Sequence, residues 1–190
     1  MELDKCIKER RSVRSFLNNK VPMDLVLDCL DSARYAPSSG NVQNFKFIVI
    51  DDNTKIKKIS SLCPKQEFIS QAPVLIVVCA VLDKIKELYG SRGEALYSIQ
   101  NCAIATQNLL LKAYDSNLST CWIGDFDEVL LTKELEIKDF ARPQAIICLG
   151  YSDEKNKPKR MPLDNFVFFN KYGKRERDTS FTPLGKYVRK

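Results

Sequence analysis

Four basic side chains crowd the stretch KERRSVRSF near the start of the chain. Lys8, Arg10, Arg11 and Arg14 fall within seven positions, and Ser12 lies between the last two arginines. Guanidinium groups form paired, charge-assisted hydrogen bonds with phosphate oxygens, and a serine hydroxyl can add another. The same arginines could instead be solvated cations at a helix C-terminus, where the helix dipole favours positive charge. The stretch by itself leaves both interpretations open.

A second polar group fills the loop APSSGNVQN, directly before an apolar and β-branched segment. Its amides and hydroxyls could bind the polar edge of a heterocycle, although an ordinary polar loop explains the composition equally well. The members of this group are Ser38, Ser39, Asn41, Gln43 and Asn44.

Two further fragments have ordinary explanations when each is taken alone. In CWIGDF, Trp122 is expected in the core and Gly124 in a turn, although a glycine there would also let backbone N–H groups approach a flat ligand. In KPKRMP, the basic run before a proline is typical of a solvated surface.

Composition excludes several kinds of active site. The chain has no histidine, so Ser-His-Asp and Cys-His machinery and HExxH zinc sites are impossible. The glycines form neither GxGxxG nor a P-loop pattern, which argues against a Rossmann dinucleotide fold and a P-loop. The seven cysteines are too widely spaced for CxxC pairs, and their apolar neighbours predict reduced structural thiols. We expect no metal site and no catalytic side chain, so the chemistry must use charges, amides, hydroxyls or a borrowed cofactor.

The net charge of +6 is unevenly distributed. Residues 150–190 carry eleven Lys and Arg against five Asp and Glu, so the whole excess lies in the C-terminal tail. A basic nucleic-acid-binding module is one interpretation, but no RNP-like aromatic strand or zinc motif accompanies the charge, and we expect no nucleic-acid partner.

The longest apolar run, residues 72–82, is too short to span a bilayer, and the N-terminus has no apolar signal region, so we expect a cytoplasmic protein without a membrane partner.

The apolar periodicity predicts one α+β domain followed by an extended C-terminal arm. The helix expected over residues 94–116 is apolar around nearly its whole circumference, which indicates burial by a partner subunit as well as by its own sheet. The expected helices are residues 3–10, 22–36, 94–116 and 127–137, with a short helix or two between residues 52 and 72, and the expected strands are 45–51, 73–81, 118–124 and 144–151.

Several motifs follow one another along the chain, namely RRSVRSF, APSSGNVQNFKF, NLLL, TCWIG and a late GY followed by KR and Pro. In the order and spacing of these motifs, the chain resembles the nitroreductase family of FMN-dependent oxidoreductases. The resemblance covers residues 5 to about 163. It implies a mixed, mainly antiparallel sheet flanked by helices, in a homodimer with FMN at the interface. Residues 1–163 would form the FMN-binding domain, and residues 164–190 a basic arm of the same unit that wraps the partner. One departure is Asn44-Phe45, where the family has Pro-Trp.

The resemblance also implies roles for individual residues. The phosphate and ribityl chain would be held by Arg10, Arg11, Ser12, Arg14, Lys159 and Arg160. The isoalloxazine would be lined, from the partner subunit, by Pro37, Ser38, Ser39, Asn41 and Gln43. Ile123 and Gly124 would present backbone near the flavin N5, and Lys65 is a candidate donor at the pyrimidine edge.

The implied reaction is a ping-pong transfer of two electrons from NAD(P)H through FMN to a nitroaromatic, a quinone or an enone. Because the cofactor carries the chemistry, such an enzyme needs no histidine. The alternative within the same superfamily is a dehalogenase or a flavin-consuming enzyme.

Overall fold

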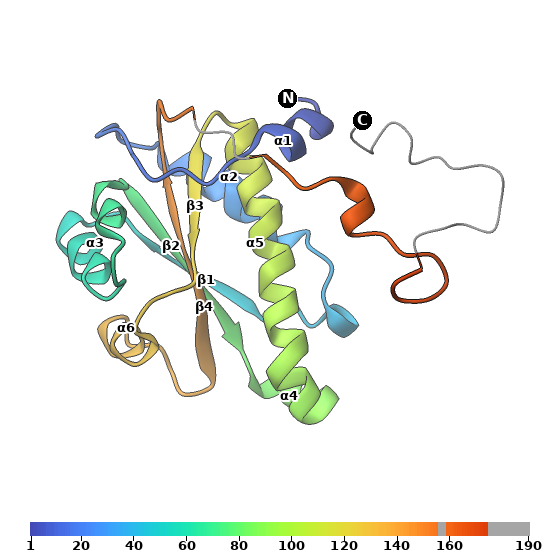
Figure 1. Ribbon diagram of the computed structural model, residues 1–190. Coiled ribbons are helices and arrows are strands. Elements are labelled where there is room, and N and C mark those ends of the chain that lie inside the picture. Colours follow the sequence, from blue (N-terminus) through green and yellow to red (C-terminus); the bar gives the residue numbers. More distant parts are fainter. Residues whose placement is uncertain (156–158, 175–190) are drawn as a thin grey trace. The chain divides into compact units, whose positions relative to one another are not determined.

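Four strands form one antiparallel sheet in the computed structural model, which describes residues 1–155 and 159–174 (Figure 1). The strands follow the order β1, β2, β4, β3 across the sheet. An isolated parallel bridge joins Ser12 to Thr120 beyond β3. The mainly antiparallel sheet of the expected α+β fold is therefore confirmed. The bounds are Phe45–Ile50 for β1, Val74–Val81 for β2, Ser119–Ile123 for β3 and Ala141–Gly150 for β4.

Helices cover both faces of this sheet, because its two central strands are apolar on both sides. Along β2 the side chains of Val74, Ile76 and Val78 point into one core, whereas Leu75 and Val77 point into the other. The first core is closed by α2 and α5, and the second by α3, α6 and the segment that contains Val13 and Phe16 (Figure 1). The strand expected to be covered on both faces is confirmed by the near-complete burial of β2.

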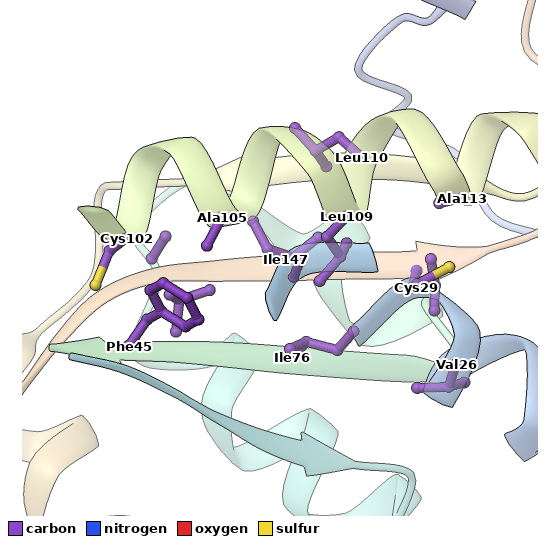
Figure 2. Packing of buried hydrophobic residues seen from close by; sticks show 14 of the residues in the cluster. Val26, Cys29, Phe45, Ile76, Cys102, Ala105, Leu109, Leu110, Ala113 and Ile147 are labelled. Carbon is purple, nitrogen blue, oxygen red and sulfur yellow. The ribbon is translucent and has the colours of Figure 1, made fainter. Parts of the chain in front are cut away.

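The first core shows how the long helix α5 is fixed against the sheet. Figure 2 shows Cys102, Ala105 and Leu109 of α5 packed over Ile76 and Ile147 of the central strands. Small residues on this face let the helix axis approach the sheet closely. The position of α5 is important for the site, because one end of this helix contacts the polar loop before β1 and the other contacts Glu9, directly before the arginine stretch.

Every expected helix is present, and the structure adds one, α4, that the sequence pattern did not predict. Only Ile85 of α4 is buried and Gly90 interrupts the helix with a φ of 58°, so its apolar period is weak. The helix predicted over 94–116 begins instead as a π-helical turn, Gly93–Tyr97. The bounds are Leu3–Glu9 for α1, Met23–Arg34 for α2, Asn53–Ser60 for α3, Asp83–Arg92 for α4, Ser98–Asp115 for α5 and Glu128–Glu134 for α6.

Residues 1–156 form one compact unit and residues 157–190 a second. In the second unit, Leu163–Asn165 forms a single 3-10 turn, and the Phe169 N–H donates to the Lys174 carbonyl at 2.7 Å. Residues 175–190 lie outside the described part of the chain. The expected division at residue 163 and the arm over 164–190 therefore stay predictions.

None of the helices formed by residues 1–155 and 159–174 combines the length and the apolar character needed to cross a bilayer. Nor does the same part of the chain contain a cluster of three or more His, Cys, Asp or Glu that could hold a metal ion.

All seven cysteines are unpaired and buried, as their apolar neighbours predict. Burial raises the pKa of the Cys29, Cys63 and Cys79 thiols to about 11, and that of Cys102 to about 12. The cause is desolvation, which penalises the thiolate. These thiols are therefore poor nucleophiles, in agreement with a structural role.

The raised thiol pKa values predict a loss of stability at alkaline pH. The unfolded thiols ionise near pH 9 and the folded ones two or more units higher, so their contribution is complete below pH 9 and is lost as the pH rises towards 11 or 12. When the pH is raised from 8 to 10, ionisation of Cys102 in the unfolded state alone should lower the free energy of unfolding by about 1 kcal/mol. Urea unfolding at both pH values measures this, and Cys102→Ala should show a smaller decrease. Equal decreases in the two proteins would contradict the assignment.

Candidate functional site

The arginine stretch begins where α1 ends, and one of its arginines does close that helix. The Arg11 Nη1 donates to the carbonyls of Lys8 and Arg10, both at 2.6 Å. The Arg11 Nε, however, is buried and has no acceptor among the described residues. A buried donor without a partner costs free energy that an added acceptor would recover. Arg11 therefore binds carbonyls at the end of α1, as the helix-end interpretation predicts, and its Nε still lacks an acceptor among the described residues.

Backbone pairing fixes the next residues of the stretch to the edge of the sheet. The isolated bridge joins Ser12 to Thr120 of β3, and the Val13 N–H donates to the Thr120 carbonyl at 3.0 Å. Val13 is buried, whereas the flanking Ser12 and Arg14 are exposed. The alternation typical of a strand therefore directs Ser12 and Arg14 away from the core.

A carboxylate that the sequence analysis did not single out contacts the same stretch. The Glu154 Oε2 accepts a hydrogen bond from the Arg14 backbone N–H at 2.6 Å, and the Glu154 N–H donates to the Ser152 hydroxyl at 3.1 Å. The Arg14 backbone N–H therefore already has an anionic acceptor, the Glu154 carboxylate, within the chain. No local pattern marks Glu154, because residues 14 and 154 meet only through the fold.

The strand β3 connects the arginine stretch to the second pair of expected residues. It runs from Thr120, beside Ser12, to Ile123 and Gly124, about 13 Å further at strand geometry. Beyond Gly124, the Gln66 amide donates to the Asp125 carbonyl at 2.9 Å. This bond places the segment that contains Lys65 beside the end of β3, because Lys65, which has a left-handed φ of 56°, directly precedes Gln66.

Trp122 differs from the expectation that it belongs to the core. Its neighbours Cys121 and Ile123 are buried, whereas Trp122 is 37% exposed on the opposite side of β3. Strand alternation is the physical reason, because the second core takes residues 121 and 123. An exposed tryptophan beside Gly124 adds an aromatic surface to this edge of the sheet.

The polar loop before β1 forms a compact turn with three residues in the left-handed region. Gly40, Asn41 and Gln43 have φ values of 55°, 57° and 49°, which is unusual for the two that carry a Cβ. The Ser38 hydroxyl accepts a hydrogen bond from the Gln43 N–H at 3.0 Å. The Gln43 side-chain amide donates to the Asn41 carbonyl and side-chain oxygens at 3.2 and 3.0 Å.

This loop is attached to the rest of the domain by residues that the site prediction did not include. Asn101 of α5 bonds both Ser39 and Asn44, and it is 2% exposed. Asn44, which stands where the family pattern has proline, is itself buried. Residue type alone could not have identified Asn101, because α5 also contains the amides Gln100, Gln107 and Asn108, and Asn101 differs from them in being buried. A pocket of about 460 Å³ lies between the loop and α5, lined by Pro37, Ser38, Ser39, Gln100, Asn101, Ala103 and Ile104.

The expected site residues therefore fall into two groups that lie apart within one chain. The arginine stretch follows Glu9, whose carboxylate accepts from the Tyr114 hydroxyl near the C-terminal end of α5. The loop binds Asn101 near the start of the same helix, thirteen residues or about 20 Å away. The loop and Gly124 also lie at opposite edges of the sheet, about 14 Å apart across three strand spacings.

Lys159 and Arg160 belong to the second compact unit of the chain, residues 157–190. Their contribution to the group formed by Arg10, Arg11 and Ser12 stays a prediction.

Solved structures show the class of fold. The NfrA2 structure from Bacillus megaterium superposes with a TM-score of 0.83 at 22% identity, over 90% of this chain and 74% of that one. An FMN-dependent nitroreductase from Clostridium difficile R20291 gives a TM-score of 0.76 at 27% identity, over 89% of this chain and 99% of that one. The arrangement of sheet and helices is therefore the nitroreductase fold.

The chain belongs to the nitroreductase family, whose sequence profile matches residues 7–66 and 60–151. A Methanothermobacter thermautotrophicus protein named as an NADH dehydrogenase/NAD(P)H nitroreductase is 32% identical over 160 residues, which cover 81% of this chain and 79% of that protein. An NAD(P)H-dependent FMN reductase of Bacillus subtilis is 27% identical over 86% of this chain and 71% of its own length. The family expected from the sequence motifs is confirmed.

The close contact between Gly40 and Tyr89 gives a test of the loop geometry. A Cβ on Gly40 would lie 2.2 Å from the Tyr89 hydroxyl oxygen, and the φ of 55° is itself unfavourable for alanine. We expect Gly40→Ala to lower the free energy of unfolding by about 2 kcal/mol. In a Tyr89→Phe background, which removes the clashing oxygen, the same substitution should cost about 1 kcal/mol less. Urea unfolding of the four proteins measures this coupling, and strictly additive effects would contradict the contact.

Proposed function

We propose that the protein is an FMN-dependent oxidoreductase that carries two electrons from NAD(P)H to an oxidised small molecule. The observation that carries the proposal is the arrangement along β3, with the arginine stretch at one end and the Gly124 backbone and the Lys65 segment at the other. Cations and a hydroxyl can form hydrogen bonds with the phosphate of a flavin nucleotide, and a glycine, which has no side chain, lets the backbone approach its flat ring. The relatives named as NAD(P)H-dependent FMN reductases and nitroreductases support the same activity.

The residues present fit FMN. Near the Ser12–Thr120 bridge, Arg10, Arg11 and Arg14 supply positive charge, and the buried Arg11 Nε needs an acceptor that a phosphate oxygen would provide. In the loop, Ser38, Asn41 and Gln43 offer hydroxyl and amide groups suited to the polar edge of the ring, while Ser39 is bonded to α5. Ser12, Ile123 and Pro37 complete the expected contacts. This assignment of residues is part of the proposal.

When bound, FMN would accept a hydride from NAD(P)H and pass the two electrons to a nitroaromatic, quinone or enone. The chain's own part is to bind and orient. The arginines would hold the phosphate, the Gly124 backbone would let the ring approach closely, and the loop would fix the polar edge. Lys65 would place a cation near the pyrimidine edge, where it would favour the reduced ring's negative charge. None of these roles requires histidine.

A homodimer would bring the two separated groups together. Within one chain the loop lies about 20 Å from the start of the arginine stretch along α5, so a loop from a second subunit would complete each site. The exposed Ile99 and Ile104 of α5, which are 43% and 40% accessible, support an interface on this helix. The outer edge of β1 has no partner strand among the described residues, so it could receive an extended segment such as the C-terminal arm. The unpaired thiols agree with a cytoplasmic location.

The dehalogenase or flavin-consuming alternative uses the same fold and the same cofactor. The two reactions differ in what becomes of the molecule that receives the electrons, so identifying the products of turnover would distinguish them. Flavin consumed in proportion to turnover would favour the alternative.

The activity itself is directly testable. We expect protein purified with added FMN to be yellow, to retain one flavin per subunit and to oxidise NADH or NADPH with a quinone or nitroaromatic acceptor. Absorbance at the nicotinamide band measures the reaction, and omission of flavin is the control. A colourless protein without flavin-dependent oxidation would overturn the proposed function.

The phosphate contact can be tested by comparing FMN with riboflavin, which lacks the phosphate. We expect Arg14→Ala to weaken FMN binding by about 1.5–3 kcal/mol, the scale of a lost charged hydrogen bond, and to leave riboflavin binding almost unchanged. Fluorescence titration with both flavins measures this. Lys8→Ala is the matched control, because Lys8 is also basic and exposed but pairs with Asp4. Equal losses for both flavins would remove Arg14 from the phosphate site.

A further inference from the structure

Asn101 is a buried amide in a helix that otherwise buries mainly apolar and small side chains. It is 2% exposed, and a buried amide is tolerated only when its donor and acceptor groups are bonded. Its Oδ1 accepts from the Ser39 N–H at 3.0 Å and from the Ser39 hydroxyl at 3.3 Å, and its Nδ2 donates to the Asn44 Oδ1 at 2.8 Å.

The orientation of this amide is determined by its partners. The Ser39 backbone N–H can only donate, so the atom facing it must be the oxygen of Asn101. The nitrogen then faces the Asn44 oxygen, and Asn44 uses its own nitrogen to donate to the Val81 carbonyl at 3.1 Å. The amides form one chain of bonds from the loop through α5 to the end of β2, and reversing the Asn101 amide would break it.

The two ends of the polar loop are thus held by a single side chain. Between Ser39 and Asn44 lie three residues with left-handed φ, and two of them, Asn41 and Gln43, carry a Cβ. A left-handed conformation is unfavourable for residues that carry a Cβ, so the loop persists only where its surroundings hold it. The bonds to Asn101 supply that restraint at both ends.

We propose that Asn101 is the positioning residue of the flavin loop, since it fixes the backbone that presents Ser38, Asn41 and Gln43. This inference rests on the proposed function, because the ligand that the loop would meet is the isoalloxazine of FMN. Asn101 acts through the loop and leaves the contact with the ligand to the loop residues.

The test compares Asn101→Leu with Thr106→Val, a matched control in the same helix. Thr106 is fully buried, and its hydroxyl donates to the Cys102 carbonyl within α5, so both substitutions remove a buried polar group from one helix. In the flavin-free protein, we expect Asn101→Leu to accelerate amide hydrogen exchange of residues 39–43 about tenfold, and Thr106→Val to leave it unchanged.

The same two variants are then titrated with FMN well below their melting temperatures. We expect the FMN dissociation constant of Asn101→Leu to rise about tenfold and the visible circular dichroism of its bound flavin to change, with neither effect in Thr106→Val. A purely structural role would lower the melting temperatures of both variants but leave FMN affinity and the flavin spectrum intact. That result, or unchanged loop exchange, would overturn the proposal.

A second variant keeps the test decisive if Asn101→Leu does not fold. Asn44→Ala leaves the bonds from Asn101 to Ser39 in place and removes the acceptor of the Asn101 nitrogen, so we expect smaller changes in exchange and FMN affinity in the same direction. No change in either would overturn the proposal. If the unmodified protein itself binds no FMN, the proposed function fails, whereas hydrogen exchange still decides whether Asn101 holds the loop.

Discussion

Burial of β2 and β4 on both faces is the constraint on which the rest of the structure depends. The side chains of β2 alternate between two cores, and each core must be covered by other elements to exclude water. On one face this cover is supplied by α2 and α5. On the other it includes Val13 and Phe16, the apolar residues within and beside the arginine stretch. Burial of Val13 thus places Ser12 and Arg14 at the exposed edge of β3, so the same apolar contacts that stabilise the fold also position its cations.

The polar loop depends on the opposite kind of interaction. It has few apolar contacts, and it contains three left-handed residues that are unfavourable without external restraint. Its conformation is determined by hydrogen bonds, within the loop from Gln43 to Ser38 and outside it from Ser39 and Asn44 to Asn101. A core packed by apolar contacts and a loop held by buried amides meet on one helix. The first supplies stability, and the second determines where exposed amides and hydroxyls can meet a ligand.

The separation of the two polar groups links the fold to assembly. Because α5 spans the domain, it keeps the loop at one end and the segment after Glu9 at the other. A site that needs both groups is incomplete in one chain and would be completed by the proposed symmetric pair, which is the arrangement that the family resemblance implies. The exposed Ile99 and Ile104 lie on this helix, so the surface that would form the dimer and the surface that anchors the loop belong to the same element.

The sequence by itself determined the α+β class and the family, together with five of the six α-helices and the four strands that the described residues form. Apolar periodicity and motif spacing are local patterns, so they can be recognised without coordinates. It also led to the prediction that the arginine stretch, the loop and the Trp-Ile-Gly strand end contact FMN. It missed α4, whose only buried residue is Ile85, and it expected Trp122 in the core, where strand alternation instead exposes it. Only the tertiary structure decided that Glu154 meets Arg14, that Gln66 meets Asp125 and that Asn101 anchors the loop. These contacts join residues 59 to 140 positions apart, and their geometry comes from the packing of two cores, which no local pattern encodes.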